Sequence, residues 1–318
     1  MNLQVTTKDG TSVHRAPPKD LTISRELIVQ RLGFGAMHLT GKGMWGDPPD
    51  PEAAIRVLRR AVELGVNFLD TADAYGPGNN EQIIRRALHP YPDDLVISTK
   101  GGLLRSGPKD WSLEGPPYIV PCGRPAYLRQ QVELSLRNLG VDCIKLYQLH
   151  AIDPTVPLAD QLGELIRLRE QGKIRYIGLS GQPAVKLDDL VRSRELTEVA
   201  SIESLYNLVD RTDETALEYA ESHDIAYVPW FPLGHGELTR PNSPLAPLAR
   251  QFDLTPAQLA LAWLLHRSPA TLLIPGTTSL RHLEENMKAR EVKLTAAEMR
   301  EITSAVDALQ LKPFRPTP

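Results

Sequence analysis

The sequence predicts an α/β protein built as a (β/α)8 barrel, the TIM-barrel architecture, with a β-hairpin before the barrel and long loops over its active-site face. From residue 29 onward, short apolar segments rich in β-branched residues alternate with amphipathic segments, which is the pattern of βα units and a parallel sheet. Eight such units can be placed in 318 residues. A closed barrel, which takes about 250 residues or more, accommodates them better than an open sheet.

Most of the eight strand candidates are too short and too β-branched to be helices. They begin at Val29, Val66, Leu95, Ile144, Ile174, Val199, Ala226 and Thr271. The first intervening helix is predicted from Asp50 as its N-cap, Pro51 at its first position and Gly65 at its end. Its apolar side chains form one stripe that should face the sheet, and comparable stripes occupy 158–166 and 259–263.

The glycines near residue 33 do not form the dinucleotide-binding fingerprint of an open sheet. Gly33 and Gly35 match the first two glycines of the G-x-G-x-x-G pattern. The third position is His38, and no helix is predicted to start there. Residues 21–30 predict a short hairpin that closes the barrel floor. Residues 101–124 are too rich in Gly and Pro for a regular element, and this loop should overhang the barrel mouth. We expect a flexible tail, one barrel domain and a second tail, at 1–19, 20–310 and 311–318.

Composition and charge point to a protein that acts on small molecules. The chain is 42% hydrophobic and 24% charged, and its formal net charge of -3 predicts no basic face for nucleic acid or an anionic membrane. Cys122 and Cys143 lack metal-site spacing and are expected to be free thiols in a reducing cytosol. No apolar run approaches the roughly 20 residues of a membrane span, and no signal peptide is recognisable. We therefore expect a cytoplasmic protein, either a monomer or a weak homo-oligomer.

Four polar residues, Asp70, Tyr75, Lys100 and His150, follow three successive short apolar strands. Their contexts are GVNFLDTADAYG, DLVISTKGG and IKLYQLH. Taken singly, each has a common structural explanation, such as packing for a tyrosine or a core pair for an aspartate and a lysine. Together they stand at the C-terminal ends of the second, third and fourth strands, where barrel enzymes carry their catalytic groups. No second His or Cys lies at ligand spacing, so we expect no metal site.

These residue types can protonate a carbonyl oxygen while hydride reaches its carbon. The unperturbed pKa of tyrosine is about 10, so Tyr75 needs a positive charge nearby to stabilise its phenolate form, and Lys100 can supply that charge. Asp70 would hold Lys100 charged and in place by a charge-assisted hydrogen bond. His150 could donate to the carbonyl and orient it. The set predicts a proton relay with an electrostatic cradle for negative charge that develops on oxygen.

Eight motifs make the chain resemble the aldo-keto reductases from about residue 20 to residue 310. They are RLGFGAM (31–37), GVNFLDTADAYG (65–76), STKGG (98–102), LYQLH (146–150), GKIRYIGLSG (172–181), SLYNLVDR (204–211), PWFPLGHGEL (229–238) and LLIPGTTSLRHLEEN (272–286). Within the family, the local sequence of these motifs is most similar to the bacterial and fungal branch that includes pyridoxal reductases and other monomeric aldehyde reductases. The resemblance implies an oxidoreductase in which the four polar residues are the family's catalytic tetrad and Tyr75 is the general acid.

The same resemblance implies that an extended NAD(P)H lies across the barrel mouth. Ser180 would contact the nicotinamide carboxamide, Trp230 would stack on the nicotinamide ring, and a turn that opens a helix at Ser279 would offer backbone N–H groups to a phosphate. Hydride would pass from the nicotinamide to a carbonyl carbon held near Tyr75 and His150. The implied cofactor positions are Gly35, Ala36, Met37, Asp70, Ser180, Gly181, Glu203, Trp230, Phe231, Pro232, Leu233, Gly234, Gly276, Thr277, Thr278, Ser279, His282, Glu285 and Asn286.

Two departures from the family pattern concern the nicotinamide. The family usually has Ser-Asn where this chain has Ser180-Gly181, and usually Gln where it has Glu203. A carboxylate at Glu203 can accept from the carboxamide but cannot donate unless it is protonated, and its charge favours the cationic oxidised ring. We hypothesise that Glu203 biases the site toward NADP+ and toward the oxidative direction.

A third departure concerns the 2'-phosphate of the cofactor. Well-studied members of the family use a Lys and an Arg at the positions that Gly276 and His282 occupy here. Arg281 is adjacent and could substitute, because an Arg fork binds a phosphate with two hydrogen bonds. We therefore expect NADPH to be preferred over NADH.

The pocket for a small-molecule carbonyl or alcohol should be built by the loops after strands one, two, three and seven. The expected lining is Met44, Trp45, Tyr75, Trp111, Tyr118, His150 and 235–245. Trp45 and Trp111 suggest an apolar or ring-bearing substrate, and packing of the loops explains them equally well. Two other functions stay open: a cofactor-binding regulatory subunit, which the family also contains, and an isomerase or lyase, which would need a phosphate-binding loop or metal ligands not found here.

Overall fold

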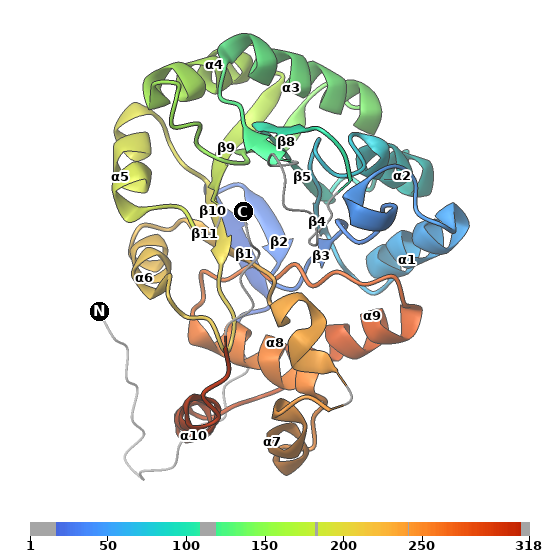
Figure 1. Ribbon diagram of the computed structural model, residues 1–318, viewed down its shortest axis with the longest axis vertical. Helices are drawn as coiled ribbons and strands as arrows, with labels where there is room; N and C mark the ends of the chain where they lie inside the picture. The colour runs from blue at the N-terminus through green and yellow to red at the C-terminus, as the bar shows by residue number, and fades with distance from the viewer. Residues whose placement is uncertain (1–16, 109–118, 182–183, 241, 313–318) are drawn as a thin grey trace.

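The structure is a computed structural model of the chain and describes residues 17–108, 119–181, 184–240 and 242–312. Seven parallel strands stand in the middle of the molecule with helices around them, as Figure 1 shows. The strand order is β11-β10-β9-β8-β5-β4-β3. The strands are β3 (Phe34–Gly35), β4 (Phe68–Asp70), β5 (Val96–Gly101), β8 (Ile144–Leu149), β9 (Ile174–Ser180), β10 (Ser201–Leu205) and β11 (Ala226–Trp230).

Single bridges close the sheet into a barrel where an eighth strand was predicted at Thr271. Leu273 pairs in parallel with Leu32, and Thr271 pairs in parallel with Tyr227. The amide of Leu273 also donates to the carbonyl of Arg31 at 2.8 Å. The predicted (β/α)8 barrel is therefore confirmed, with its last strand reduced to isolated bridges.

The first predicted strand is wrong in position. Val29 belongs to β2 (Leu27–Gln30), which pairs antiparallel with β1 (Asp20–Ile23), and the barrel strand is β3 instead. Ile23, Leu27 and Val29 bury one face of this hairpin in a cluster with apolar residues of the barrel strands. The alternation that resembled a barrel strand is thus the inner face of the predicted floor hairpin.

Helices surround the barrel, and the first of them begins directly after its predicted N-cap. Asp50 accepts a hydrogen bond from the amide of Ala53 at 2.8 Å, and Thr255 and Gln258 form a capping box. The α-helices are α1 (Pro51–Glu63), α2 (Asn79–Leu88), α3 (Pro125–Leu139), α4 (Leu158–Glu170), α5 (Leu187–Leu196), α6 (Glu214–Ser222), α7 (Leu245–Gln251), α8 (Pro256–Arg267), α9 (Leu280–Met287) and α10 (Ala296–Ala308). The 3-10 helices are η1 (Lys42–Met44), η2 (Gly234–Thr239) and η3 (Lys288–Glu291). No helix within the described ranges is long and apolar enough to cross a membrane.

The segment 101–124 contains regular structure, contrary to the expectation from its Gly and Pro content. β6 (Leu103–Arg105) and β7 (Ile119–Pro121) pair antiparallel as a two-stranded ribbon. Proline is compatible with such a ribbon because its edge does not need every backbone N–H group. Trp111 and Tyr118, two of the predicted pocket residues, lie outside the described residues.

Candidate active site

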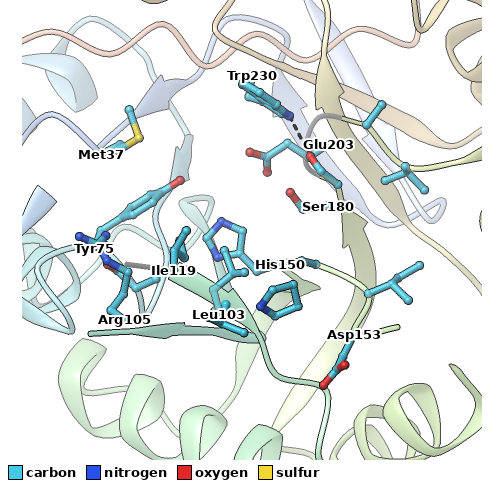
Figure 2. A pocket seen from close by; sticks show the side chains of 18 of the residues that line it. Met37, Tyr75, Leu103, Arg105, Ile119, His150, Asp153, Ser180, Glu203 and Trp230 are labelled. Atoms are coloured by element: carbon cyan, nitrogen blue, oxygen red, sulfur yellow. Dashed lines mark hydrogen bonds between the residues drawn. The ribbon is translucent and has the colours of Figure 1, made fainter. Parts of the chain in front are cut away.

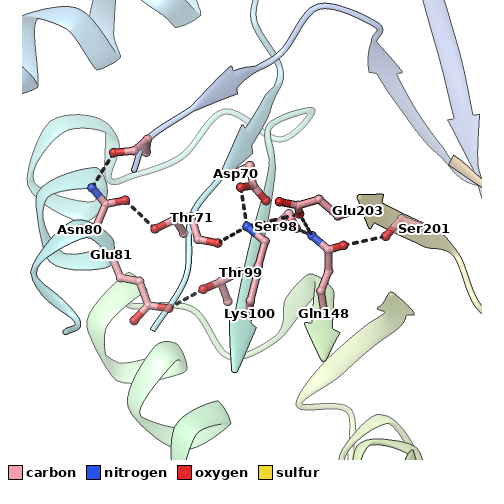
Figure 3. Close-up of polar contacts among 11 residues, drawn as sticks. Asp70, Thr71, Asn80, Glu81, Ser98, Thr99, Lys100, Gln148, Ser201 and Glu203 are labelled. Carbon is pink, nitrogen blue, oxygen red and sulfur yellow. Dashed lines mark hydrogen bonds and ion pairs between the residues drawn. The ribbon is translucent and has the colours of Figure 1, made fainter. Parts of the chain in front are cut away.

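The centre of the site is a buried ion pair between neighbouring strands. Lys100 lies near the end of β5 and Asp70 at the end of β4, where Lys100 Nζ donates to Asp70 Oδ2 at 2.5 Å and to the carbonyl of Thr71 at 3.1 Å. Figure 3 shows this hydrogen bond, which the sequence predicts, together with the polar residues around it. Burial alone lowers the pKa of Lys100, but Asp70 and Glu203 more than offset it, so the pKa lies above that of an ordinary lysine.

Tyr75 lies in the turn after β4, with its ring beside Lys100. Lys100 Nζ is 5.3 Å from the centroid of the Tyr75 ring. Burial raises the pKa of the phenol; Lys100 lowers it, while Asp70 and Glu203 oppose the lysine. The lysine therefore acts in the predicted direction, but the net pKa of Tyr75 is above that of free tyrosine. The pattern of residue types could not show this result, because it depends on burial and on both carboxylates.

His150 follows β8 and faces Tyr75 across the barrel mouth. The two ring centroids are 5.9 Å apart with an interplanar angle of 84°, and the amide of His150 donates to the carbonyl of Gly101 at 2.9 Å. Burial, then the charges of Lys100 and Arg105, hold the pKa of His150 well below its usual value, so the ring is neutral near pH 7. His150 Nδ1 is buried and has no hydrogen-bond partner among the described residues.

A second carboxylate joins the ion pair from β10. Glu203 Oε2 lies 3.3 Å from Lys100 Nζ and accepts from Gln148 Nε2 at 2.9 Å. Sequence reasoning missed Gln148, although its signal was available: Gln148 is two residues before His150 on one strand, so both side chains point to the same face. Ser201 and Glu203 are related in the same way on β10, and Ser201 Oγ donates to Gln148 Oε1 at 3.2 Å.

Two cavities meet at these residues. One of about 1390 Å³ extends over β6, β7 and the start of α5, and one of about 510 Å³ runs along the end of β11 toward α9. Both cavities are lined by Met37, His38, Tyr75, Glu203, Trp230, Phe231 and His235. In Figure 2, Tyr75 and Glu203 point into the larger cavity from opposite sides, and His150 lies below them. The site can thus hold two molecules end to end, with Tyr75 at their junction.

A model of the aldo/keto reductase family matches residues 31–307. This chain belongs to that family. It is 46% identical over 271 residues to an uncharacterised oxidoreductase of Schizosaccharomyces pombe, with 85% of each chain covered. It is 41% identical over 287 residues to pyridoxine 4-dehydrogenase of Escherichia coli, with 88% of this chain and 95% of the relative covered. The protein is therefore an oxidoreductase.

Solved aldo-keto reductase structures share the barrel over nearly its whole length. The glycerol dehydrogenase of Gluconobacter oxydans superimposes with a TM-score of 0.81 at 27% identity, covering 94% of this chain and 98% of that one. An aldo-keto reductase of Klebsiella pneumoniae, solved in complex with NADPH, gives a TM-score of 0.74 at 25% identity, with coverages of 94% and 97%. These likenesses agree with the fold derived above.

The smaller cavity collects most of the cofactor positions that the family resemblance implies. The residues of that set that line it are Gly35, Met37, Asp70, Glu203, Trp230, Phe231, Pro232, Leu233, Gly276, Thr277, His282, Glu285 and Asn286. Ser180 and Gly181 line the larger cavity instead. The remaining four, Ala36, Gly234, Thr278 and Ser279, are not among the lining residues of either cavity. Arg281 lines the groove beside His282, with 2.8 Å between Arg281 Nη2 and His282 Nε2.

The shape of this groove suits the extended dinucleotide of an aldo-keto reductase. A Cβ atom at Gly276 would lie 2.5 Å from the carbonyl oxygen of Gly35, so glycine allows the two backbones to approach at the groove wall. At the far end, Ser279 caps α9 by accepting from the amide of His282 at 3.4 Å, and the N-terminus of a helix favours an anion. Trp230 Nε1 donates to the carbonyl of Gly181 at 3.2 Å, which fixes the indole at the junction of the cavities.

The local backbone explains why position 181 is a glycine. A Cβ atom at Gly181 would lie 2.2 Å from the carbonyl carbon of Ala184 and 2.3 Å from the amide nitrogen of Val185. The chain that returns toward α5 therefore fills the place of a side chain. The amide of Val185 donates to Ser204 Oγ at 3.0 Å, which holds this return in place.

The larger cavity differs from the predicted substrate pocket in several respects, and of the described residues in 235–245 only His235 lines it. Met44, Tyr75 and His150 line it, but Trp45 is not among its lining residues and is 39% exposed. The guanidinium of Arg105 lies 5.7 Å from the Trp45 ring centroid and donates to the carbonyls of Ala74 and Gly43. Arg105, which sequence reasoning did not select, therefore forms part of the cavity wall. Within the described part of the chain, no group of three His, Cys, Asp or Glu side chains could hold a metal ion.

Two histidines at the junction were not predicted as a pair. His38 follows β3 and His235 lies in η2, and their rings stack with centroids 5.8 Å apart. Burial, then the charge of His235, lowers the pKa of His38 to about 4, so His38 is neutral near pH 7. The contact joins the loop after β3 to the segment after β11 across the groove.

Proposed function

We propose that the protein interconverts a carbonyl compound and its alcohol by hydride transfer with NADP(H), and that Tyr75 is the general acid and base. The observation that carries the proposal is the meeting of Tyr75, Lys100 and His150 where the two cavities join. A cofactor in the smaller cavity and a substrate in the larger one would both reach Tyr75.

The proposed roles follow from charge and protonation. Tyr75 gives its proton to the substrate oxygen, and Lys100, held by Asp70, stabilises the phenolate that remains. His150 is neutral, so one ring nitrogen donates to the same oxygen and orients the carbonyl. The cofactor, when bound, supplies or accepts the hydride. Because burial raises the pKa of Tyr75, the positive charge of Lys100 is essential for this role.

NADP(H) is the proposed cofactor for two reasons, one from solved relatives and one from the groove itself. The Klebsiella pneumoniae relatives were solved with NADPH and with NADP, and their barrels superimpose on this one. Arg281 and His282 stand together at the end of the groove where α9 begins, which provides nitrogen donors for a 2'-phosphate. NADH is the less favoured alternative.

A ring-bearing aldehyde is the substrate class that we propose to test first. The Escherichia coli relative is a pyridoxine 4-dehydrogenase, and the match covers most of each chain. The larger cavity here has room for such a ring beside Tyr75 and His150. Pyridoxal is therefore the first compound, followed by aliphatic aldehydes and ketones of similar size.

The test is NADPH oxidation with this panel by the wild type and by Tyr75→Phe. We expect at least a hundredfold lower kcat in the variant, because general acid catalysis contributes about 10²–10⁴-fold. Tyr219→Phe, which removes a hydroxyl on the outer helix α6, is the matched control and should keep wild-type activity. Turnover that is insensitive to Tyr75→Phe contradicts the mechanism, and tight cofactor binding without turnover of any compound supports the regulatory-subunit alternative.

A further inference from the structure

One buried ammonium group faces two carboxylates at the end of the cofactor groove. Lys100 Nζ lies 2.5 Å from Asp70 Oδ2 and 3.3 Å from Glu203 Oε2. The exposed fractions of the three side chains are 0%, 3% and 4%. If all three were ionised, the cluster would carry a net negative charge that water does not screen.

Among the described residues that are coupled to Glu203, Lys100 is the only cation, and Asp70 already shares it. Asp70 on β4, Lys100 on β5 and Tyr75 after β4 are the titratable groups coupled to it. The neighbouring strands contribute uncharged side chains: Gln148 from β8, which donates to Glu203, and Ser180 and Trp230 from β9 and β11, which line the same cavity. Burial first, and then the charge of Asp70, raise the pKa of Glu203 to about 8.

Glu203 also faces the position, beside Ser180 and Trp230, that the family resemblance implies for the nicotinamide. It lines both cavities, as does Trp230, and Figure 2 shows its carboxyl pointing into the opening between Trp230 and Tyr75. The oxidised nicotinamide ring is a cation, whereas the reduced ring is neutral. A cation within a few ångströms stabilises the ionised form of a carboxyl group, and a neutral ring does not.

We propose that Glu203 keeps a proton when the reduced cofactor is bound and loses it when the oxidised cofactor is bound, so that cofactor oxidation state and proton binding are linked at this residue. The proposal rests on the proposed NADP(H) function and concerns this chain's own carboxyl group. Gln, the residue that the family usually has here, has no proton to exchange at any pH of interest. The linkage is therefore specific to sites that have a glutamate at this position, as this chain does.

The sign of the linkage follows from the two protonation states. NADP+ favours ionised Glu203, so its binding tightens as the pH rises, until Glu203 is ionised in the free protein as well. NADPH binding does not gain from this ionisation. The ratio of NADP+ affinity to NADPH affinity must then increase with pH, and a shift of about one pKa unit or more corresponds to about a tenfold change or more.

The experiment measures the dissociation constants of NADP+ and NADPH by tryptophan fluorescence from about pH 6 to about pH 9. The ratio of the two constants cancels titration of the phosphates, which both cofactors share. We expect the ratio to change at least about tenfold in the wild type and to stay constant in Glu203→Gln. Glu164→Gln removes another buried carboxylate, on α4 outside the site, and should behave as the wild type.

A second measurement needs no variant. Calorimetry of the wild type near pH 7 in buffers of different ionisation enthalpy should show more proton release when NADP+ binds than when NADPH binds, because the proton release from the shared 2'-phosphate is the same for both cofactors. A pH-independent ratio in the wild type, or a slope that persists in Glu203→Gln, overturns the linkage while leaving the proposed function intact. Failure of both cofactors to bind overturns the proposed function itself, and the linkage with it.

Discussion

A single lysine decides the electrostatics of the site. Lys100 is fully buried and contacts Asp70, Glu203 and the carbonyl of Thr71, so it compensates the charge of Asp70 and, when Glu203 is ionised, that of Glu203 as well. Removing one partner of a buried ion pair costs more than the pair contributes, because the remaining charge has lost both water and its partner. The consequence at this site is that activity and stability depend on the same ammonium group.

Lys100→Met should therefore abolish hydride transfer and lower the free energy of unfolding by about 3–5 kcal/mol. The double variant Lys100→Met/Glu203→Gln should be more stable than Lys100→Met alone, because one of the two buried carboxyl groups that lost the contact with Lys100 has been replaced by an uncharged amide. Urea unfolding of the wild type, both single variants and the double variant measures this coupling. Strict additivity of the two costs would show that Lys100 and Glu203 do not interact.

At the scale of the element, strand alternation explains how the site is assembled. Alternate side chains of each strand point into the barrel, among them Lys100 of β5, Gln148 of β8 and Glu203 of β10. The side chains next to them on the same strand face the helices. Thr99, for example, donates to Glu81 on α2 at 2.7 Å. The inward residues meet because the parallel strands end at one face. The order of the strands in the sheet, more than their spacing in the chain, therefore determines which inward side chains touch.

Gly101, directly after Lys100, shows how tightly β5 and β8 pack. A Cβ atom at Gly101 would lie 2.0 Å from the hydroxyl oxygen of Tyr147, whose hydroxyl has no hydrogen-bond partner among the described residues. Gly101→Ala should destabilise the protein by about 1–3 kcal/mol and lower activity by displacing Lys100.

Tyr147→Phe supplies the test of that cause. Adding it to Gly101→Ala should recover part of the lost stability and activity, because the clashing oxygen is removed. Gly163→Ala on α4, where a Cβ atom meets nothing within 4 Å, is the control and should stabilise by roughly 0.5–1 kcal/mol. Thermal unfolding and kcat of each variant are the readouts. No recovery in the double variant would contradict the steric explanation.

At the scale of the whole molecule, a buried arginine completes the barrel. Arg31 donates to the carbonyls of Leu265 and Thr271 at 2.9 Å and 3.0 Å and to that of Ser268 at 2.5 Å. Burial lowers its pKa to about 10, so it stays charged near pH 7. It thereby ties the start of the barrel to the chain after α8, where the eighth strand is reduced to bridges.

Arg31→Met should lower the free energy of unfolding by at least about 3 kcal/mol, because several buried carbonyls lose a charged donor. Arg31→Lys should recover little, since an ammonium cannot reproduce the geometry of the guanidinium. Arg56→Met, at a side chain that is 59% exposed, should change stability by less than about 0.5 kcal/mol. Chemical denaturation compares the three, and equal costs at Arg31 and Arg56 would exclude a closing role for Arg31.

The sequence by itself determined the barrel, most of its strands and helices, and the four polar residues at its mouth. These features are local, because strand periodicity, caps and the ends of apolar segments can be read within a few residues. Only the tertiary structure decided that Val29 belongs to the floor hairpin, that Arg31 helps to close the barrel, and that Glu203 and Gln148 join Lys100. It also decided the sign of the net pKa shift at Tyr75. Burial and through-space charge set these properties, and both depend on segments far apart in the chain.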